Sequence, residues 1–219
     1  MNPIIQKRYD KAGPRVAAAL SRRNMEAFYC PTAIEGAQKV LELIAPEDVV
    51  SWGGAMTADE MNLKELLRRR GQPVIDRDTA ATPAERQELM RKALTCDTFL
   101  MSSNAISEDG QLVNIDGNGN RVAAMLFGPK KVLVFAGCNK IVRDIDDAAK
   151  RVKSCATPAN AMRLNLDTPC THGACPGTDG ELCAGCRSEN RICAMYTVLA
   201  CQRVKGRIHV ILIGEEVGY

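Results

Sequence analysis

The sequence predicts an α/β protein built on a mostly parallel sheet with helices on both faces. Helical patterns and short apolar strands alternate along the chain, which is typical of parallel-sheet proteins. The segment KKVLVFAG, residues 130–137, is almost continuously apolar, as expected of a strand buried on both faces. With 219 residues the chain can bury a sizeable core, so we expect one domain over residues 1–219.

The first half of the chain carries clear helix-start signals. A helix is predicted over residues 2–25 and a strand over 28–30. Thr32 with Glu35 forms a capping box that opens the next helix, which ends before Pro46. The remaining strands are expected in DVVSWGGAM (48–56), QPVIDRD (72–78), DTFLMSSNAIS (97–107), QLVNID (111–116), KKVLVFAG (130–137) and GRIHVILIGE (206–215). The remaining helices are expected in TADEMNLKELLRRRG (57–71), capped by Thr57, TPAERQELMRKALTC (82–96), capped by Thr82, and DIDDAAKRVKSCA (144–156).

Charge and hydropathy indicate a cytoplasmic protein without a nucleic-acid or membrane partner. The net charge of +3 is small, and the arginine runs fall in helical patterns, where solvated helix faces explain them. We see no signal-peptide pattern and no apolar run long enough to span a membrane. A homodimer is expected only because homodimers are the commonest soluble oligomers.

Two glycines stand at a predicted strand-to-helix turn. Gly53 and Gly54 precede Thr57, where a helix is expected to begin. Glycine allows close backbone approach, and a helix N-terminus offers unpaired N–H groups to an anion. Anion binding is one interpretation of this turn, and turn geometry alone is the other.

A cluster of polar residues follows in the middle of the chain. Asn, Asp and Gly are typical of tight turns, so a hairpin would explain most of this stretch. The stretch also carries acidic groups and an arginine, which can transfer protons or hold a carboxylate or phosphate. The candidate catalytic residues are Glu108, Asp116 and Arg121, and the candidate anion-binding residues here are Asn104, Asn118 and Asn120.

Lys140 follows the apolar strand 130–137 and precedes a helix. Ligands of open α/β sheets bind outside the carboxyl ends of the strands. We therefore expect Lys140, Arg121 and the glycine turn to gather at one edge of the sheet.

Several of these segments resemble the LUD (lactate-utilisation) domain family, above all its stand-alone bacterial and archaeal members. The matching stretches are SWGGAMTADE, VIDRD, SSNAISEDGQLVNIDGNGNRVAAMLFGPKKVLVFAGCNKIVRD, PANAMRLN, TPC with CAGCRSENRIC, and IHVILIGEEVGY. The resemblance implies a fold like that of sugar-phosphate isomerases and CoA transferases and a link to organic-acid oxidation. By analogy with the glutamate nucleophile of CoA transferases, it places Glu108 in a comparable glycine-containing loop.

Residues 168–193 form a cysteine-rich segment, which we expect to be an irregular metal-binding insertion. Reduced cytosolic thiols favour metal or cluster binding over disulfides, although disulfides stay an alternative. The resemblance implies ligands in TPC, CxxC and RIC, which are Cys170, Cys183, Cys186 and Cys193, with Cys175 as an alternative. Four thiolates fit a [4Fe-4S] cluster or a structural Zn²⁺, and the single CxxC with many glycines favours the cluster.

Two functions follow from the sequence. The first is an iron–sulfur protein in the redox metabolism of a small organic acid such as lactate, acting with a redox partner protein. The second is a non-redox enzyme of the isomerase or CoA-transferase type, or a carboxylate-binding protein, with a structural zinc. The sequence leaves the substrate and the reaction open.

Overall fold

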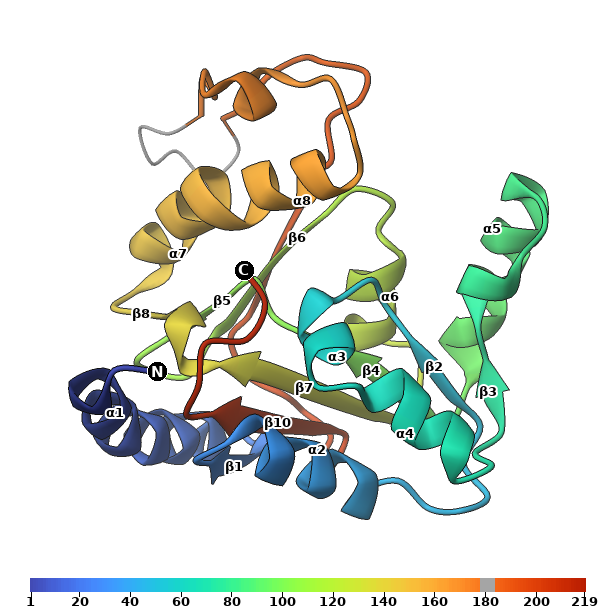
Figure 1. Cartoon of the computed structure of the whole chain (residues 1–219), viewed down its shortest axis with the longest axis vertical. Helices are drawn as coiled ribbons and strands as arrows, with labels where there is room; N and C mark the ends of the chain where they lie inside the picture. Colours follow the sequence, from blue (N-terminus) through green and yellow to red (C-terminus); the bar gives the residue numbers. More distant parts are fainter. Residues whose placement is uncertain (178–183) are drawn as a thin grey trace.

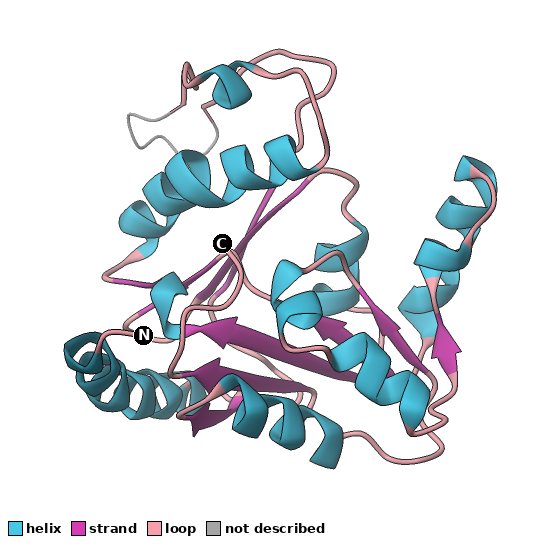
Figure 2. Ribbon diagram, in the orientation of Figure 1, coloured by secondary structure: helices cyan, strands magenta, loops and turns pink. Residues whose placement is uncertain are grey.

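A computed structural model describes residues 1–177 and 184–219 of the chain. Its centre is a six-stranded sheet in which every pair of neighbours is parallel (Figures 1 and 2). In the order β1-β10-β7-β4-β2-β3 the strands span Glu26–Cys30, Ile208–Ile213, Lys131–Gly137, Thr98–Met101, Val50–Trp52 and Val74–Ile75. Strands β7 and β10 are almost wholly buried, which explains why their sequences are continuously apolar.

Helices cover both faces of this sheet, so the predicted α/β fold with a mostly parallel sheet is confirmed. Apolar residues of α1 and α6 pack on one face, and those of α2, α3 and α4 pack on the other. The helices span Pro3–Arg22 (α1), Ala33–Glu42 (α2), Met56–Glu60 (α3), Leu63–Arg69 (α4), Pro83–Lys92 (α5), Asn120–Leu126 (α6), Ile145–Arg151 (α7) and Thr157–Arg163 (α8). Within the described ranges, none of them is long and apolar enough to cross a membrane.

A second, smaller sheet stands beside the first in the order β8-β5-β6-β9. Its strands span Ile141–Val142, Ala105–Ser107, Leu112–Asp116 and Met195–Leu199. The outer pair β5 and β8 is parallel, whereas β6 is antiparallel to both β5 and β9. Helix α7 and the π-helical turn Val152–Ala156, which leads into α8, pack against this sheet.

Local signals of the sequence set several boundaries correctly. The hydroxyl of Thr32 accepts the Glu35 amide at 3.2 Å, and that of Thr82 accepts the Glu85 amide at 3.1 Å. Both therefore cap helices as predicted. Thr57 was predicted to cap a helix and does not, because α3 already begins at Met56 and the Thr57 hydroxyl bonds elsewhere.

Three predicted elements differ in the structure. The helix expected over 57–71 is two helices, because Asn62 adopts a left-handed conformation with φ of 54°. The polar run that follows β6 leads directly into helix α6, where a turn was the simpler interpretation. Strand β9, Met195–Leu199, was not predicted, because it lies just after the irregular cysteine segment and has mixed burial.

Candidate functional site

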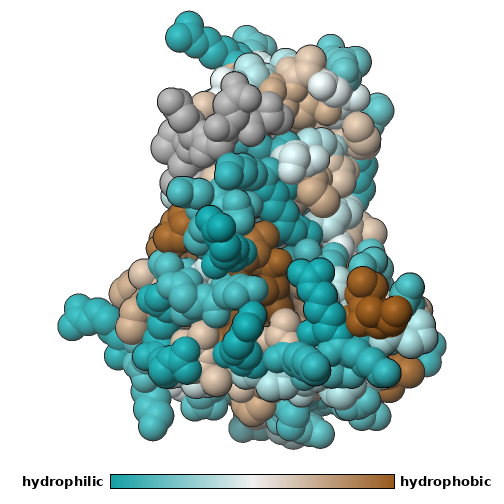
Figure 3. Space-filling view, turned by 90° about the vertical axis from the view of Figure 1, so that its left-hand side faces the viewer, coloured by the Kyte–Doolittle hydropathy of each residue, from teal (hydrophilic) through white to brown (hydrophobic). Residues whose placement is uncertain are grey.

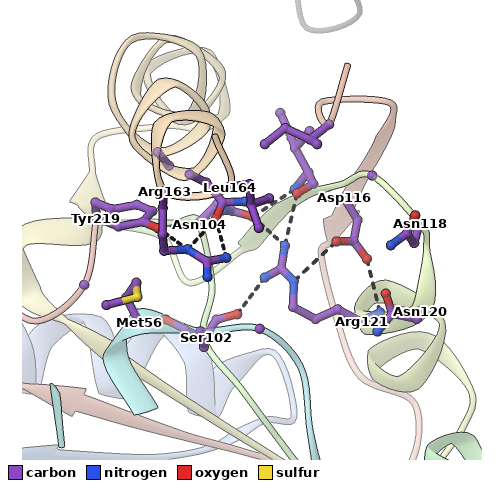
Figure 4. A pocket seen from close by; sticks show the side chains of 18 of the residues that line it. Met56, Ser102, Asn104, Asp116, Asn118, Asn120, Arg121, Arg163, Leu164 and Tyr219 are labelled. Atoms are coloured by element: carbon purple, nitrogen blue, oxygen red, sulfur yellow. Dashed lines mark hydrogen bonds and ion pairs between the residues drawn. The ribbon is translucent and has the colours of Figure 1, made fainter. Parts of the chain in front are cut away.

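A polar pocket of about 500 Å³ lies between α8 and the carboxyl ends of β2, β3, β4 and β7 (Figure 4). This is the position at which open α/β sheets bind ligands. The pocket brings together many of the residues predicted from the sequence: Gly54, Thr57, Asn104, Asp116, Asn118, Asn120, Arg121 and Lys140. The volume is within the range of small-molecule sites.

Lys140 is the most unusual titratable group of the pocket. It directly follows β7 in a short 3₁₀ turn and is 2% exposed. Its Nζ donates to the hydroxyls of Thr57, at 2.9 Å, and Ser102, at 3.0 Å. Burial, together with the charges of Arg151 and Arg121, lowers the pKa of Lys140 to about 7. A lysine of this kind is largely neutral just above pH 7 and can accept a proton.

Arg121, predicted as an anion clamp, is engaged by the protein itself. Its four terminal N–H groups donate to the carbonyls of Ser102 and Ile115 and to the side chains of Asn114 and Asn104, at 2.8–3.1 Å. Its Nε lies 3.6 Å from Asp116. Arg121 therefore fixes the walls of the pocket, and its donors are already used (Figure 4).

The acidic and amide residues beside Arg121 divide into two groups. Asp116 accepts the backbone amide of Arg121 at 3.1 Å, so this carboxylate holds the start of α6. The side-chain oxygen of Asn104 is engaged within the protein, because it accepts from the Ile115 amide and from the Arg121 guanidinium. Asn118 and Asn120 line the cavity beside them (Figure 4).

Each of the two predicted glycines is closely approached by an arginine side chain. A Cβ at Gly53 would lie 3.0 Å from the side-chain carbons of Arg121. A Cβ at Gly54 would lie 2.7 Å from Nη2 of Arg77. The glycine turn therefore lets arginine side chains pack on the backbone at the edge of the pocket.

Sequence reasoning missed several cationic residues of the pocket, namely Lys64, Arg77, Arg86, Arg163 and Arg191. Arg163 of α8 donates to Asn160 and to the Tyr219 hydroxyl at 2.8–3.1 Å, which places it over the pocket (Figure 4). In the sequence these arginines looked like solvated helix or loop residues. Only the VIDRD stretch offered a signal, since Arg77 lies near the carboxyl end of a predicted strand.

Glu108 lies in a different place. It forms an ion pair with Arg15 of α1 at 2.9 Å, and the two line a second depression with Arg8, Arg143 and Cys138. Figure 3, which looks at the side of α1, shows a mostly hydrophilic face with hydrophobic residues in small separate areas. The structure thus separates Glu108 from Asp116 and Arg121.

The cysteine segment contributes a wall of the pocket. Residues 189–192 line the cavity, and Cys193 is buried behind them. Arg191 holds this stretch together, because its guanidinium donates to the carbonyls of Cys186 and Cys193 at 3.0 and 2.9 Å and to the Tyr196 hydroxyl at 2.8 Å.

The predicted metal ligands are only partly described. Cys183 lies outside the described residues. Cys170 lies in a 3₁₀ turn, with its sulfur 3.2 Å from the Thr168 hydroxyl. In residues 1–177 and 184–219, no three Cys, His, Asp or Glu side chains form a group that could hold a metal. The described thiols, Cys170, Cys175, Cys186 and Cys193, therefore do not make a ligand set without Cys183.

The fold and pocket define an α/β protein with a polar pocket at the carboxyl ends of its parallel strands. The chain belongs to the LUD domain family, whose model matches residues 14–213. The predicted family is thereby confirmed. Membership of this family suggests a function related to lactate utilisation.

Three solved structures are similar to this chain to different degrees. A DUF162-family protein from Deinococcus radiodurans matches with a TM-score of 0.53 at 14% identity, covering 94% of this chain and 98% of that chain, which shows a shared fold. Ribose 5-phosphate isomerase A from Methanocaldococcus jannaschii matches with a TM-score of 0.34 at 14% identity, covering 59% of this chain and 66% of that chain. The structure of eIF2B delta from Chaetomium thermophilum matches with a TM-score of 0.34 at 19% identity, covering 52% of this chain and 49% of that chain. A search of curated proteins gave no significant match.

Proposed function

We propose that this LUD protein binds a small organic acid in the pocket as its carboxylate and that Lys140 takes up a proton from solvent as the acid binds. The Lys140 Nζ, neutral in the free protein, becomes an ammonium group that faces the bound anion. The observation that carries the proposal is the burial of Lys140 at the pocket between the Thr57 and Ser102 hydroxyls. Ligand binding changes the protonation of a group most readily when the pKa of that group is close to the working pH, and the pKa of Lys140 is about 7.

The charges of the pocket support an anionic ligand. Arg77, Arg163 and Lys64 line it together with Lys140, and the glycine turn exposes backbone close to Arg77. A hydroxy acid offers one carboxylate for such cations, and its negative charge favours the ammonium form of Lys140. This arrangement supports the carboxylate-binding function predicted from the sequence.

Proton uptake on binding tests the proposal. An anion bound beside Lys140 favours the ammonium form, so binding of lactate, glycolate or malate at pH 8 is expected to take up to about one proton from the buffer. Calorimetry in buffers of different ionisation enthalpy measures this uptake. The Lys140→Met variant is expected to show almost none. Lys39→Met, on α2 and outside the pocket lining, is the matched control and keeps the wild-type value. Equal uptake by wild type and Lys140→Met, or no binding of any of these acids, would contradict the proposal.

A second candidate function is redox chemistry at a [4Fe-4S] cluster held by Cys170 or Cys175 with Cys183, Cys186 and Cys193. Its support is the position of the cysteine segment, since residues 189–192 border the same pocket. A structural Zn²⁺ ion is the alternative to the cluster at these cysteines. The redox partner protein and the homodimer stay predictions from the sequence.

Metal analysis separates these occupants. Protein purified without oxygen is expected to contain about four iron and four sulfide per chain if the cluster is present, with a broad visible absorption band. The Cys186→Ser variant is expected to lose this content, whereas Cys201→Ser, an exposed cysteine outside the segment, keeps it. One zinc per chain without a visible band would contradict the cluster and the redox function.

A further inference from the structure

Arg77 is a partly buried cation whose hydrogen-bonding capacity is mostly unused. It opens the 3₁₀ turn Arg77–Thr79 after β3, and its side chain is 14% exposed. Its Nε is buried and has no hydrogen-bond partner among the described residues. Its Nη1 contacts the sulfur of Met90 at 3.6 Å, which is a weak acceptor. Buried guanidinium groups in proteins normally have stronger acceptors.

The immediate surroundings of Arg77 carry an excess of positive charge. Asp78 is shared by three cations, lying 3.8 Å from Arg77, 3.1 Å from Arg86 and 3.2 Å from Lys64. Lys64 has a second carboxylate, Asp59, at 2.9 Å. Three cations therefore share two carboxylates, and all five side chains line the pocket. One further negative charge would balance this group.

The shape of the backbone beside Arg77 leaves room for such a charge. Nη2 of Arg77 lies over Gly54, where any side chain would come within 2.7 Å of it. Glycine at this position keeps the guanidinium at the pocket edge, next to a turn of exposed backbone. The planar fork of arginine fits a carboxylate or a phosphate with two parallel hydrogen bonds.

Arg77 and Lys140 stand at different ends of the pocket. In the sheet order β7-β4-β2-β3, the strand before Lys140 and the strand before Arg77 are three positions apart. At about 4.8 Å between neighbouring strands, their backbones are roughly 14 Å apart. The main charges around Lys140 are Arg151 and Arg121, whereas those around Arg77 are Asp78 and Arg86.

The size of the pocket also exceeds what a short acid needs. A three-carbon hydroxy acid has about six non-hydrogen atoms and fills less than roughly 200 Å³, taking about 30 Å³ for each water-sized group. The cavity holds about 500 Å³.

We infer that Arg77, which lies over the Gly54 turn, forms a second subsite of the pocket. This subsite binds a terminal phosphate or carboxylate group of an elongated organic acid, and the other end of the same acid reaches Lys140. This inference rests on the proposed function, because it assigns the other end of the same substrate. It changes the substrate class from a simple short acid to an acid that carries a second anionic group.

Binding of inorganic phosphate and of succinate tests the subsite by calorimetry and thermal shift. Wild type is expected to bind phosphate, whereas Arg77→Gln weakens this binding at least tenfold and Arg77→Lys weakens it less strongly. Arg143→Gln removes the same charge from an 80% exposed position and serves as the matched control, with phosphate binding unchanged. Thermal unfolding without ligand verifies that Arg77→Gln is folded.

The outcomes separate the two proposals. The subsite would be overturned if wild type and Arg77→Gln bound phosphate equally. It would also be overturned if wild type bound neither phosphate nor succinate. Both outcomes are independent of the proton uptake measured with Lys140→Met. Loss in Arg77→Gln without any Lys140-dependent proton uptake would support the subsite and reject the role of Lys140. Tighter binding of phosphate than of succinate would identify the terminal group as a phosphate, and the reverse order would identify a carboxylate.

Discussion

Replacing Arg121 by methionine is expected to lower the free energy of unfolding by roughly 3–5 kcal/mol, as removal of one partner from a buried charged network does. In this variant the Asp116 carboxylate loses its ion-pair partner. The buried oxygen atoms of Ser102, Asn114 and Ile115 that accept from Arg121 lose their donors. Urea unfolding followed by circular dichroism measures the change.

Two further variants sharpen this test. Arg121→Lys keeps the charge but cannot reach four acceptors from one ammonium group, so it is expected to recover only a small part of the loss. Arg143→Met, at an exposed position, is expected to change stability by no more than about 0.5 kcal/mol. A loss below about 1 kcal/mol in Arg121→Met would show that the network does not hold the pocket walls.

The Arg121 network connects fold and site. It joins the end of β4, the side chain of Asn104 and the end of β6 to the start of α6. These are the segments on which Ser102 and Asp116 face the pocket. Arg121, which is buried and uses its N–H donors within the protein, thus holds the pocket walls together. Arg77 has fewer hydrogen-bond acceptors among the described residues, so it is the better candidate for ligand binding.

Local rules predicted the parts of the fold that local interactions determine. The caps at Thr32 and Thr82 depend on side chain and backbone three residues apart, and both are present. The burial of β7 follows from its apolar run. The break at Asn62 and strand β9 depend on tertiary packing, which a single segment does not reveal.

The candidate site was predicted by topology better than by chemistry. The rule that ligands bind at the carboxyl ends of strands predicted that the glycine turn, Arg121 and Lys140 would gather, and Gly54, Arg121 and Lys140 line one pocket. This rule could not predict that the four terminal N–H groups of Arg121 would all donate to carbonyl oxygens of the protein. It also could not predict that the guanidinium of Arg77 would lack strong hydrogen-bond acceptors in the described part of the chain. Both properties depend on contacts between segments far apart in the sequence.

The Lys140→Met variant is expected to gain stability relative to wild type as the pH falls. The pKa of Lys140 is about 7 in the folded protein and near its ordinary value of 10.5 in the unfolded chain. Between these values the unfolded state binds more protons, so this lysine makes wild type more stable as the pH rises from about 7 to 10.5. Below about pH 7 the full cost of burying an ammonium group applies, and methionine removes it.

The size of the effect follows from the shift. At 1.36 kcal/mol per pKa unit, a difference of about 3.5 units gives an upper value of roughly 5 kcal/mol between the two ends of the range. The unpaired hydroxyls of Thr57 and Ser102 in the variant cost about 1–3 kcal/mol each, but this cost does not change with pH. The difference in unfolding free energy between the two proteins, measured in urea at pH 6, 7.5 and 9, therefore isolates Lys140 from the other titrating groups. The two proteins differ in one titrating side chain, Lys140. If the difference between their unfolding free energies stays constant over this pH range, the lysine is charged in the folded protein. Lys140 could then not accept a proton at neutral pH.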